Sequence, residues 1–313
     1  MFCGRTSIVM SWKRHWTLLP VVSVVSVEPV NRWSSSNMLK QRVITALILA
    51  PLLIWGIFSL PESGFIILLL AVFSVAAWEW SRLSGLTQPG SRLFYVVILF
   101  VLMGLAGFVF SSHPVLIDIL YLVIGGLWLL ILPGLFYYQH HEVTRSGFSL
   151  FKLIAGAGII LGPFVALLVL RHRDPFGPQW VMYLLLLIWI ADSGAYFSGR
   201  AFGKHKLLYN VSPGKSWEGV AGGLLGCLVL ALVAGWWFEL GVMHYAWFVV
   251  VSLVVVLFSV AGDLVESLFK RQAEVKDSGH ILPGHGGILD RIDSLTAAAP
   301  VFASGLYLVG LFI

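Results

Sequence analysis

The sequence predicts an all-α, polytopic integral membrane protein with about nine transmembrane helices. The first observation is composition: 58% of the 313 residues are hydrophobic, 11% are charged, and the mean hydropathy is +0.91. Soluble domains carry charge on about a quarter of their residues. The second observation is that apolar runs long enough to cross a bilayer as helices recur along the whole chain. These runs lack the two-residue alternation of β-barrel strands, so helices are expected.

Nine expected spans lie between polar breaks in the sequence. They cover 42–60, 64–80, 93–111, 115–136, 153–171, 179–198, 219–239, 245–265 and 296–313. Glycine pairs at GxxxG spacing predict close helix packing in two of these spans. The pairs are Gly219 with Gly223, Gly222 with Gly226, and Gly158 with Gly162.

The distribution of basic residues predicts the orientation of these spans. With the N-terminus in the cytoplasm, every Lys and Arg from Met38 onward falls on the cytoplasmic side, except Arg171 and Arg173. The positive-inside rule therefore places the N-terminus inside and the C-terminus outside. The same rule explains the net charge of +5 better than a nucleic-acid partner does, so none is expected.

Residues 1–37 are interpreted as a leader or an over-extended start that the protein can dispense with. Their basic beginning and modest apolar run imitate a signal peptide only loosely. The stretch that starts at Met38 reads MLKQRVITALILAP, in which a short basic head leads directly into a span. The expected domain therefore covers 38–313.

Polar side chains gather in two cytoplasmic segments of this apolar chain. The first reads IADSGAYFSGRAFGKHKLLYNVSPGKSWEGVAGG and the second GDLVESLFKRQAEVKDSGHILPGHGGILDRIDS. Asp192 and Asp263 belong to otherwise apolar helices, where an acid usually faces a cavity, a partner or an ion. A structural ion pair between helices is an equal alternative for any single acid, and it is the interpretation that we favour for Glu79 and Asp118.

The second segment offers carboxylates at helical spacing. Asp263, Glu266, Ser267 and Lys270 follow each other at i, i+3, i+4 and i+7, which places them on one helical face. Several acids beside phosphate-type loops suit Mg²⁺, which binds one or two carboxylates together with substrate phosphate.

Asp290 and Asp293 are three residues apart in DRID, so they can share a face at the start of the last span. Helix N-capping explains either of them alone equally well.

Both segments also contain features that suit a phosphate group. In SPGKSWEG, Lys215 precedes an expected helix N-terminus, which is a ready anion site, although a helix capped by Ser216 needs no ligand. The glycines of PGHGG let backbone N–H groups approach a phosphate, but this signal alone is weak. His280 and His285 do not predict zinc, because no Cys or third His lies nearby.

The second segment resembles the signature of the phosphatidate cytidylyltransferase (CDP-diglyceride synthetase) family of bacterial type. The matching residues are Ser267, Lys270, Arg271, Lys276, Asp277, Pro283, His285, Gly286, Gly287, Asp290, Arg291 and Asp293. The runs DSGAYFSGRAFGKHK and SPGKSWEG of the first segment are also similar to this family. The resemblance extends from about Met38 to the end of the chain.

This resemblance implies a catalysed reaction in which CTP and phosphatidic acid give CDP-diacylglycerol and pyrophosphate. It implies Mg²⁺ as cofactor, with room for a second ion such as K⁺. Asp263 and Asp290 would hold the metal, with Asp293 close by. The catalytic loops would be 199–218 and 266–295, on the cytoplasmic side of a bacterial inner membrane. A homodimer is compatible with it.

The resemblance also assigns residues to the substrates. Lys215, Ser212, Lys276 and Arg291 would lie around the nucleotide phosphates, with Lys215 and Lys276 counted as catalytic. The remaining expected substrate-binding residues are Ser267, Lys270, Arg271, Asp277, His285, Gly286, Gly287, Asp192 and Arg200.

Three other classes of membrane protein fit the sequence less well. A CDP-alcohol phosphatidyltransferase requires a DGxxAR pattern that this chain lacks. The KD…PGHGG…DRID run argues against a CTP-dependent polyprenol kinase. A transporter would also bury acids in its spans, but it often shows internal repeats and paired broken spans, which we do not find.

Overall fold

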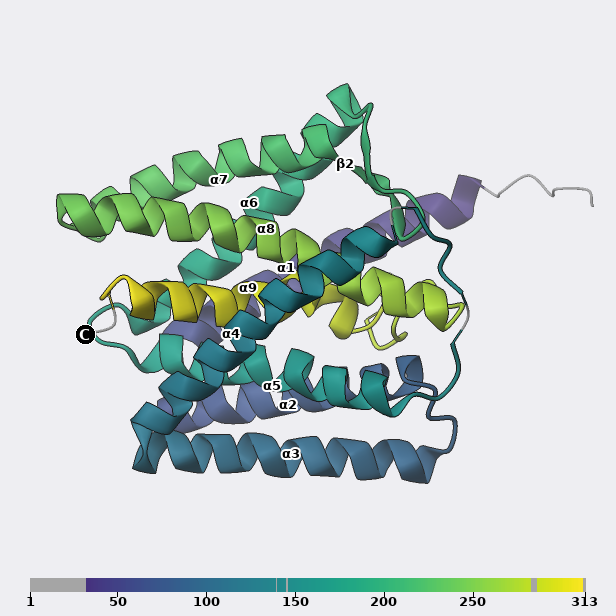
Figure 1. The fold of residues 1–313 in the computed structure, drawn as a ribbon, viewed down its shortest axis with the longest axis horizontal. Coiled ribbons are helices and arrows are strands. Elements are labelled where there is room, and N and C mark those ends of the chain that lie inside the picture. The colour runs from purple at the N-terminus through teal and green to yellow at the C-terminus, as the bar shows by residue number, and fades with distance from the viewer. Residues whose placement is uncertain (1–31, 139, 145, 283–285, 312–313) are drawn as a thin grey trace, which may run out of the picture.

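The computed structural model describes residues 32–138, 140–144, 146–282 and 286–311. Nine α-helices occur in this part of the chain (Figure 1). They are α1 Arg32–Ser59, α2 Glu62–Leu83, α3 Pro89–Ser112, α4 Pro114–Tyr137, α5 Leu150–His172, α6 Gly177–Phe202, α7 Trp217–Trp237, α8 Val242–Gln272 and α9 Leu289–Leu308.

Seven of the nine helices, α2 to α8, are long and apolar enough to cross a membrane. The prediction of a helical integral membrane protein is therefore confirmed. The described apolar part of α1 is shorter, at Leu47–Ser59, and the first turns of α9 carry Asp290, Arg291 and Asp293. The count of nine spans and the orientation of the termini stay predictions.

The helix α9 lies in the middle of the bundle and holds its two halves together (Figure 1). It packs against α8 on one side and against α4 and α5 on the other. Ala297, Ala298, Ala299 and Ala303 of α9 are completely buried, and such small residues let helix backbones approach closely. At Gly262 of α8, an added Cβ would lie 2.5 Å from the Asp293 carbonyl oxygen, so the α8–α9 contact requires glycine there.

The close packing predicted for the glycines of α7 is confirmed, and the structure shows that α6 is the partner. A Cβ added at Gly223 would lie 2.8 Å from the Ala191 carbonyl oxygen, and one at Gly219 would lie 2.9 Å from the Ala195 carbonyl oxygen. The same prediction is wrong for Gly158 of α5, where a Cβ would meet nothing within 4 Å.

A short hairpin between α6 and α7 adds two strands to the all-α expectation. The strands β1 Lys206–Leu208 and β2 Ser212–Ser216 are antiparallel, and Lys206 pairs with Ser216. Leu208 and Val211 at its tip are buried, which fixes the hairpin to the bundle. The segment 199–218 thus consists of the last turn of α6, this hairpin and the first residues of α7.

The helices α8 and α9 extend further toward each other than the apolar runs indicated. Because α8 continues to Gln272 and α9 begins at Leu289, only residues 273–288 of the expected loop 266–295 lie between the two helices. At the other end of the chain, α1 begins at Arg32, and most of the expected leader lies outside the described residues.

Candidate active site

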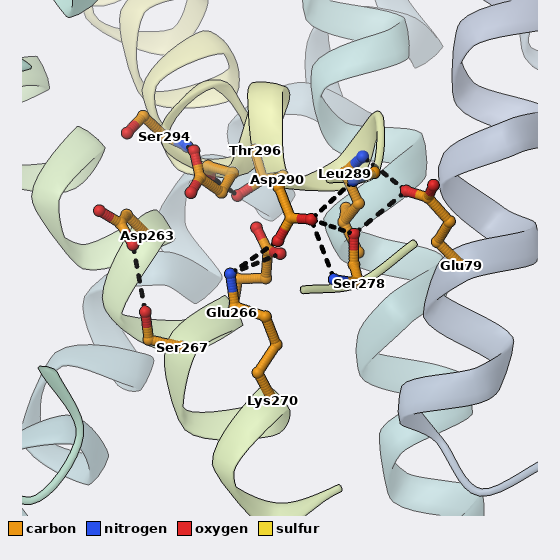
Figure 2. A network of polar contacts seen from close by, with 12 residues as sticks. Glu79, Asp263, Glu266, Ser267, Lys270, Ser278, Leu289, Asp290, Ser294 and Thr296 are labelled. Carbon is orange, nitrogen blue, oxygen red and sulfur yellow. Dashed lines mark hydrogen bonds and ion pairs between the residues drawn. The ribbon is translucent and has the colours of Figure 1, made fainter. Parts of the chain in front are cut away.

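The last turns of α8 present the predicted row of polar side chains. Ser267 Oγ donates to Asp263 Oδ1 at 3.2 Å, and Lys270 Nζ lies 3.1 Å from Glu266 Oε1 (Figure 2). The prediction that these four residues share one helical face is confirmed. This row forms one wall of the candidate site.

Lys215 connects the two polar segments of the sequence. It lies on β2, just before α7, and its Nζ is 2.6 Å from Asp263 Oδ2. The following residue, Ser216, caps α7 as predicted, because its Oγ accepts from the Gly219 N–H at 3.1 Å. The Lys215 and Asp263 side chains keep 24% and 28% of their surface exposed, so a ligand can reach both.

Two further carboxylates lie near this contact and interact with Asp263 through their charges. Asp192 on α6 interacts with Asp263, and Asp263 interacts with Asp293 on α9. Lys215 and Arg291 act on Asp192 as opposite charges. Asp192 is exposed, whereas Asp263 and Asp293 are half-buried. Negative charge therefore gathers here on atoms that a hard cation could reach.

Asp290 lies in a second, more deeply buried group of contacts. Its Oδ1 accepts from Lys270 Nζ at 2.8 Å. Its Oδ2 accepts from the N–H groups of Ser278 and Gly287, at 2.9 and 2.8 Å, and from Ser278 Oγ at 3.0 Å. Both oxygens are thus engaged by the protein, but none of these donors belongs to α9 and the N-cap position is Ile288, so the capping alternative is wrong for Asp290. Its role as a metal ligand stays a prediction.

Glu79 reaches this group from α2 (Figure 2). Its carboxylate accepts from the N–H groups of Leu289 and Ile288, at 2.7 and 3.2 Å, and from Ser278 Oγ at 3.2 Å. No cation pairs with Glu79 in the part of the chain that the structure describes, so the ion-pair interpretation is wrong for it.

The ion-pair interpretation holds for the other acid, Asp118. Its Oδ1 lies 2.9 Å from Arg173 NH2, in the half of the bundle away from the candidate site.

Sequence reasoning gave Glu79 and Ser278 no role in the site. The usable signal for Glu79 was an acid inside an otherwise apolar helix, with the sequence AAWEWSRL. Ser278 carried no signal of its own, because its two carboxylate partners come from different helices.

Several other expected residues surround the site without joining the hydrogen-bond network. Ser212 begins β2, and Arg271 Nε donates to the Val211 carbonyl oxygen at 3.4 Å. Arg200 is exposed and donates to Tyr196 Oη on its own helix at 3.2 Å.

The connection 273–288 carries the remaining expected residues. Lys276 and Asp277 are exposed on it. Gly286 has a φ of +82°, which glycine adopts without strain, and its carbonyl oxygen accepts from the Leu282 N–H at 2.9 Å. His285 lies outside the described residues.

The accessible carboxylates fit Mg²⁺. No three Asp, Glu, His or Cys side chains converge tightly enough for a complete protein-made metal site within the described ranges. Mg²⁺ does not need such a site, because it usually keeps waters and binds one or two carboxylates together with substrate phosphate. Asp263 and Asp293 offer such oxygens.

Comparison with known proteins assigns this chain to a family. A model of the cytidylyltransferase family matches residues 40–309. A phosphatidate cytidylyltransferase of Pseudomonas aeruginosa is 43% identical over 280 residues, which are 87% of this chain and 98% of the relative. The enzyme of the same name from Haemophilus influenzae is 42% identical over 285 residues, covering 85% and 98%. That of Bacillus subtilis is 32% identical over 285 residues, covering 84% and 95%.

We call the group of Asp192, Lys215, Asp263, Asp290 and Asp293 the polar centre. Together with the apolar helices, this centre defines an integral membrane enzyme. The chain belongs to the cytidylyltransferase family, and it is a nucleotidyltransferase. The family resemblance inferred from the two polar segments is confirmed.

Proposed function

We propose that this enzyme transfers CMP from CTP to phosphatidic acid and releases pyrophosphate. The observation that carries the proposal is the contact between Lys215 and Asp263, which joins the two family-type segments in one reachable place. The names of the relatives supply the substrate, phosphatidate, and the cytidylyl group. CDP-diacylglycerol would be the lipid product, as in phospholipid biosynthesis.

The reaction brings two polyanions together, and the site contains groups that offset their repulsion. An oxygen of the phosphatidate monoester forms a bond to the α-phosphorus of CTP, and the bond from that phosphorus to the β-phosphate oxygen breaks. Lys215, Arg291 and Lys276 would stabilise the nucleotide phosphates and the departing pyrophosphate. The attacking oxygen is already anionic, so it needs orientation more than deprotonation.

Asp263 and Asp293 would hold Mg²⁺, with Asp290 as the expected further ligand. The bound ion would screen charge on the phosphates and stabilise the leaving group. Asp290 would take part only after giving up some of its present hydrogen bonds, because Lys270, Ser278 and Gly287 engage both of its oxygens.

The position of the site suits one soluble and one lipid substrate. It lies at the ends of α6, α8 and α9, which are the cytoplasmic ends in the predicted orientation. CTP would enter from the cytoplasm of a bacterial cell, and the phosphatidate headgroup from the inner membrane beside these helices.

The decisive experiment supplies purified protein with radiolabelled CTP, phosphatidic acid and Mg²⁺, followed by lipid extraction. We expect label in the lipid phase that depends on phosphatidic acid and disappears when EDTA removes the metal. Absence of labelled lipid, with the protein intact in detergent, would reject the function.

Isotope exchange tests whether the transfer is direct. A covalent cytidylyl-enzyme would need an activated nucleophile with a base in reach. We expect no labelled pyrophosphate to enter CTP until phosphatidic acid is added. Exchange without lipid would reject direct displacement and direct attention to Ser212, Ser216 and Ser267.

A further inference from the structure

We propose that Glu79 is a positioning residue, which fixes Ser278, Gly279 and the start of α9 and so places Asp290 and Asp293. The inference rests on the proposed function for its kinetic part. Glu79 belongs to α2 and lies outside the two polar segments that carry the family signature. Its contribution would come through three donors of the neighbouring elements rather than through the substrates.

The first step of the argument concerns the N-terminus of α9. The first N–H groups of a helix have no partner within the helix, so a side chain or a ligand must accept them. Ile288, at the N-cap position, has no side-chain oxygen and makes no capping bond. Glu79 accepts the N–H groups of Ile288 and Leu289 instead, from 209 and 210 residues away in the sequence. The positive end of the α9 dipole also favours a carboxylate there.

The second step concerns Ser278, which lies between two carboxylates. Its Oγ is 3.2 Å from Glu79 Oε2 and 3.0 Å from Asp290 Oδ2, while its N–H donates to Asp290 (Figure 2). A hydroxyl carries one proton, so Ser278 shares it between the two acids. Through Ser278, the α2 acid is connected to Asp290, and through Asp290 to Lys270 on α8.

The third step explains two glycines of the connection. A Cβ added at Gly287 would lie 2.5 Å from both carboxylate oxygens of Glu79. A Cβ at Gly279 would overlap Glu79 Oε1 and lie 2.7 Å from its Cδ. The backbone therefore closes around this carboxylate on two sides. Such a fit leaves the connection little freedom to shift while Glu79 is in place.

The experiment compares wild-type enzyme with Glu79→Gln, which keeps the shape and removes the charge. Hydrogen exchange followed by mass spectrometry would be measured on peptides that cover 286–295. We expect faster exchange there in the variant, because an amide group offers fewer acceptors to the α9 N–H groups. We also expect kcat to fall about 10²-fold, the effect of roughly 1 Å of misplacement at a reacting centre.

The Mg²⁺ dependence separates positioning from loss of folded protein. Fewer folded molecules lower the total rate and leave the half-saturating Mg²⁺ concentration unchanged. Misplaced Asp293 and Asp290 raise that concentration, and we expect a rise of at least about tenfold, as for lost partners of metal ligands. An unchanged Mg²⁺ dependence together with wild-type exchange at 286–295 would overturn the proposal.

Asp118→Asn is the control, since it also removes the charge of a helix carboxylate, in this case a half-buried one that pairs with Arg173 away from the site. We expect it to leave the exchange of 286–295 and the Mg²⁺ dependence as in wild type. The same changes in this control would overturn the proposal, because they would show a general response to a lost acid.

A second variant covers the case in which Glu79→Gln does not accumulate in the membrane. Gly279→Ala keeps the acid and forces it away from α9, whereas Gly147→Ala places a Cβ where nothing lies within 4 Å. Faster exchange at 286–295 in the first and not in the second supports the proposal, and equal exchange overturns it. The exchange measurement needs no turnover, so it tests the contact between Glu79 and α9 even if the proposed reaction fails.

Discussion

At the scale of single residues, the acids of the site divide into two environments. Asp263 pairs with a cation that is itself partly exposed, and both stay within reach of a ligand. Asp290 is 8% exposed and accepts four donors, three of them on one oxygen. One aspartate is thus accessible to a ligand, whereas the other is held by hydrogen bonds within the protein.

Asp263→Asn should remove activity and leave the fold intact. The pair that it breaks is partly exposed, and such pairs contribute about 0–1 kcal/mol. The loss of a ligand charge should lower turnover at least about 100-fold, as the loss of metal-site partners does. The rate of labelled lipid formation and the melting temperature in detergent check both parts. Near-normal turnover would contradict the role of Asp263.

Asp290→Asn should lower both activity and stability. Removing one partner of a buried charge pair costs up to about 3–5 kcal/mol, and Lys270 would keep only Glu266 as an opposite charge. We therefore expect a clear drop in melting temperature that Asp263→Asn does not show. Equal melting temperatures for the two variants would contradict the division of roles.

The sequence predicted the acids of the site better than their partners. Charge in an apolar helix marks Asp192 and Asp263 without any structure, because such a group is costly in a bilayer. Pattern alone could not pair Glu79 with the α9 amides, since that contact joins residues 210 apart and one of its partners is backbone. The sequence also could not show that both oxygens of Asp290 accept hydrogen bonds, because three of the donors belong to Ser278 and Gly287 and reach Asp290 only in the folded protein.

At the scale of elements, apolar runs located every helix and misjudged some ends. The apolar run of α8 stops where its charged residues begin, yet the helix continues to Gln272 because those charges lie on one face. The hairpin 206–216 was missed, because a three-residue strand leaves no periodic pattern. Glycine spacing predicted close packing by α7, since small residues are what close helix packing requires, but it could not predict that the partner is α6.

Gly223→Ala should force α7 away from α6 near Asp192. The added Cβ would lie 2.8 Å from the Ala191 carbonyl oxygen, so the backbones must separate. Overpacking of this kind costs about 1–3 kcal/mol. We expect a lower melting temperature and lower turnover than in Gly107→Ala of α3, where a Cβ meets nothing within 4 Å. Equal behaviour of the two variants would contradict the tight contact.

At the scale of the whole molecule, the polar centre lies where α8 ends and α9 begins, among helices that are long and apolar enough to cross a membrane. Helices from both halves of the chain reach it: α2 from the first half, and α6, α8 and α9 from the second. Sequence length and hydropathy predicted the bundle, but they could not predict which helices meet at the centre.

The orientation is tested by reporters. Alkaline phosphatase fused after Ile313 should be active, because the predicted C-terminus lies outside. The same reporter in the connection 140–150 should be inactive, because the predicted position is cytoplasmic. The reverse pattern would place the polar centre on the outer side and remove its access to CTP.

The bond from Glu79 to α9 joins the second of the described helices to emerge from the ribosome with the last of them. During synthesis, α2 waits in the membrane with an acid that has no lasting partner, and an acid within a helix raises the cost of insertion by up to about 3 kcal/mol. Arrival of α9 supplies that partner and completes the polar centre in the same event. Nascent chains therefore carry an incomplete centre until α9 has been made.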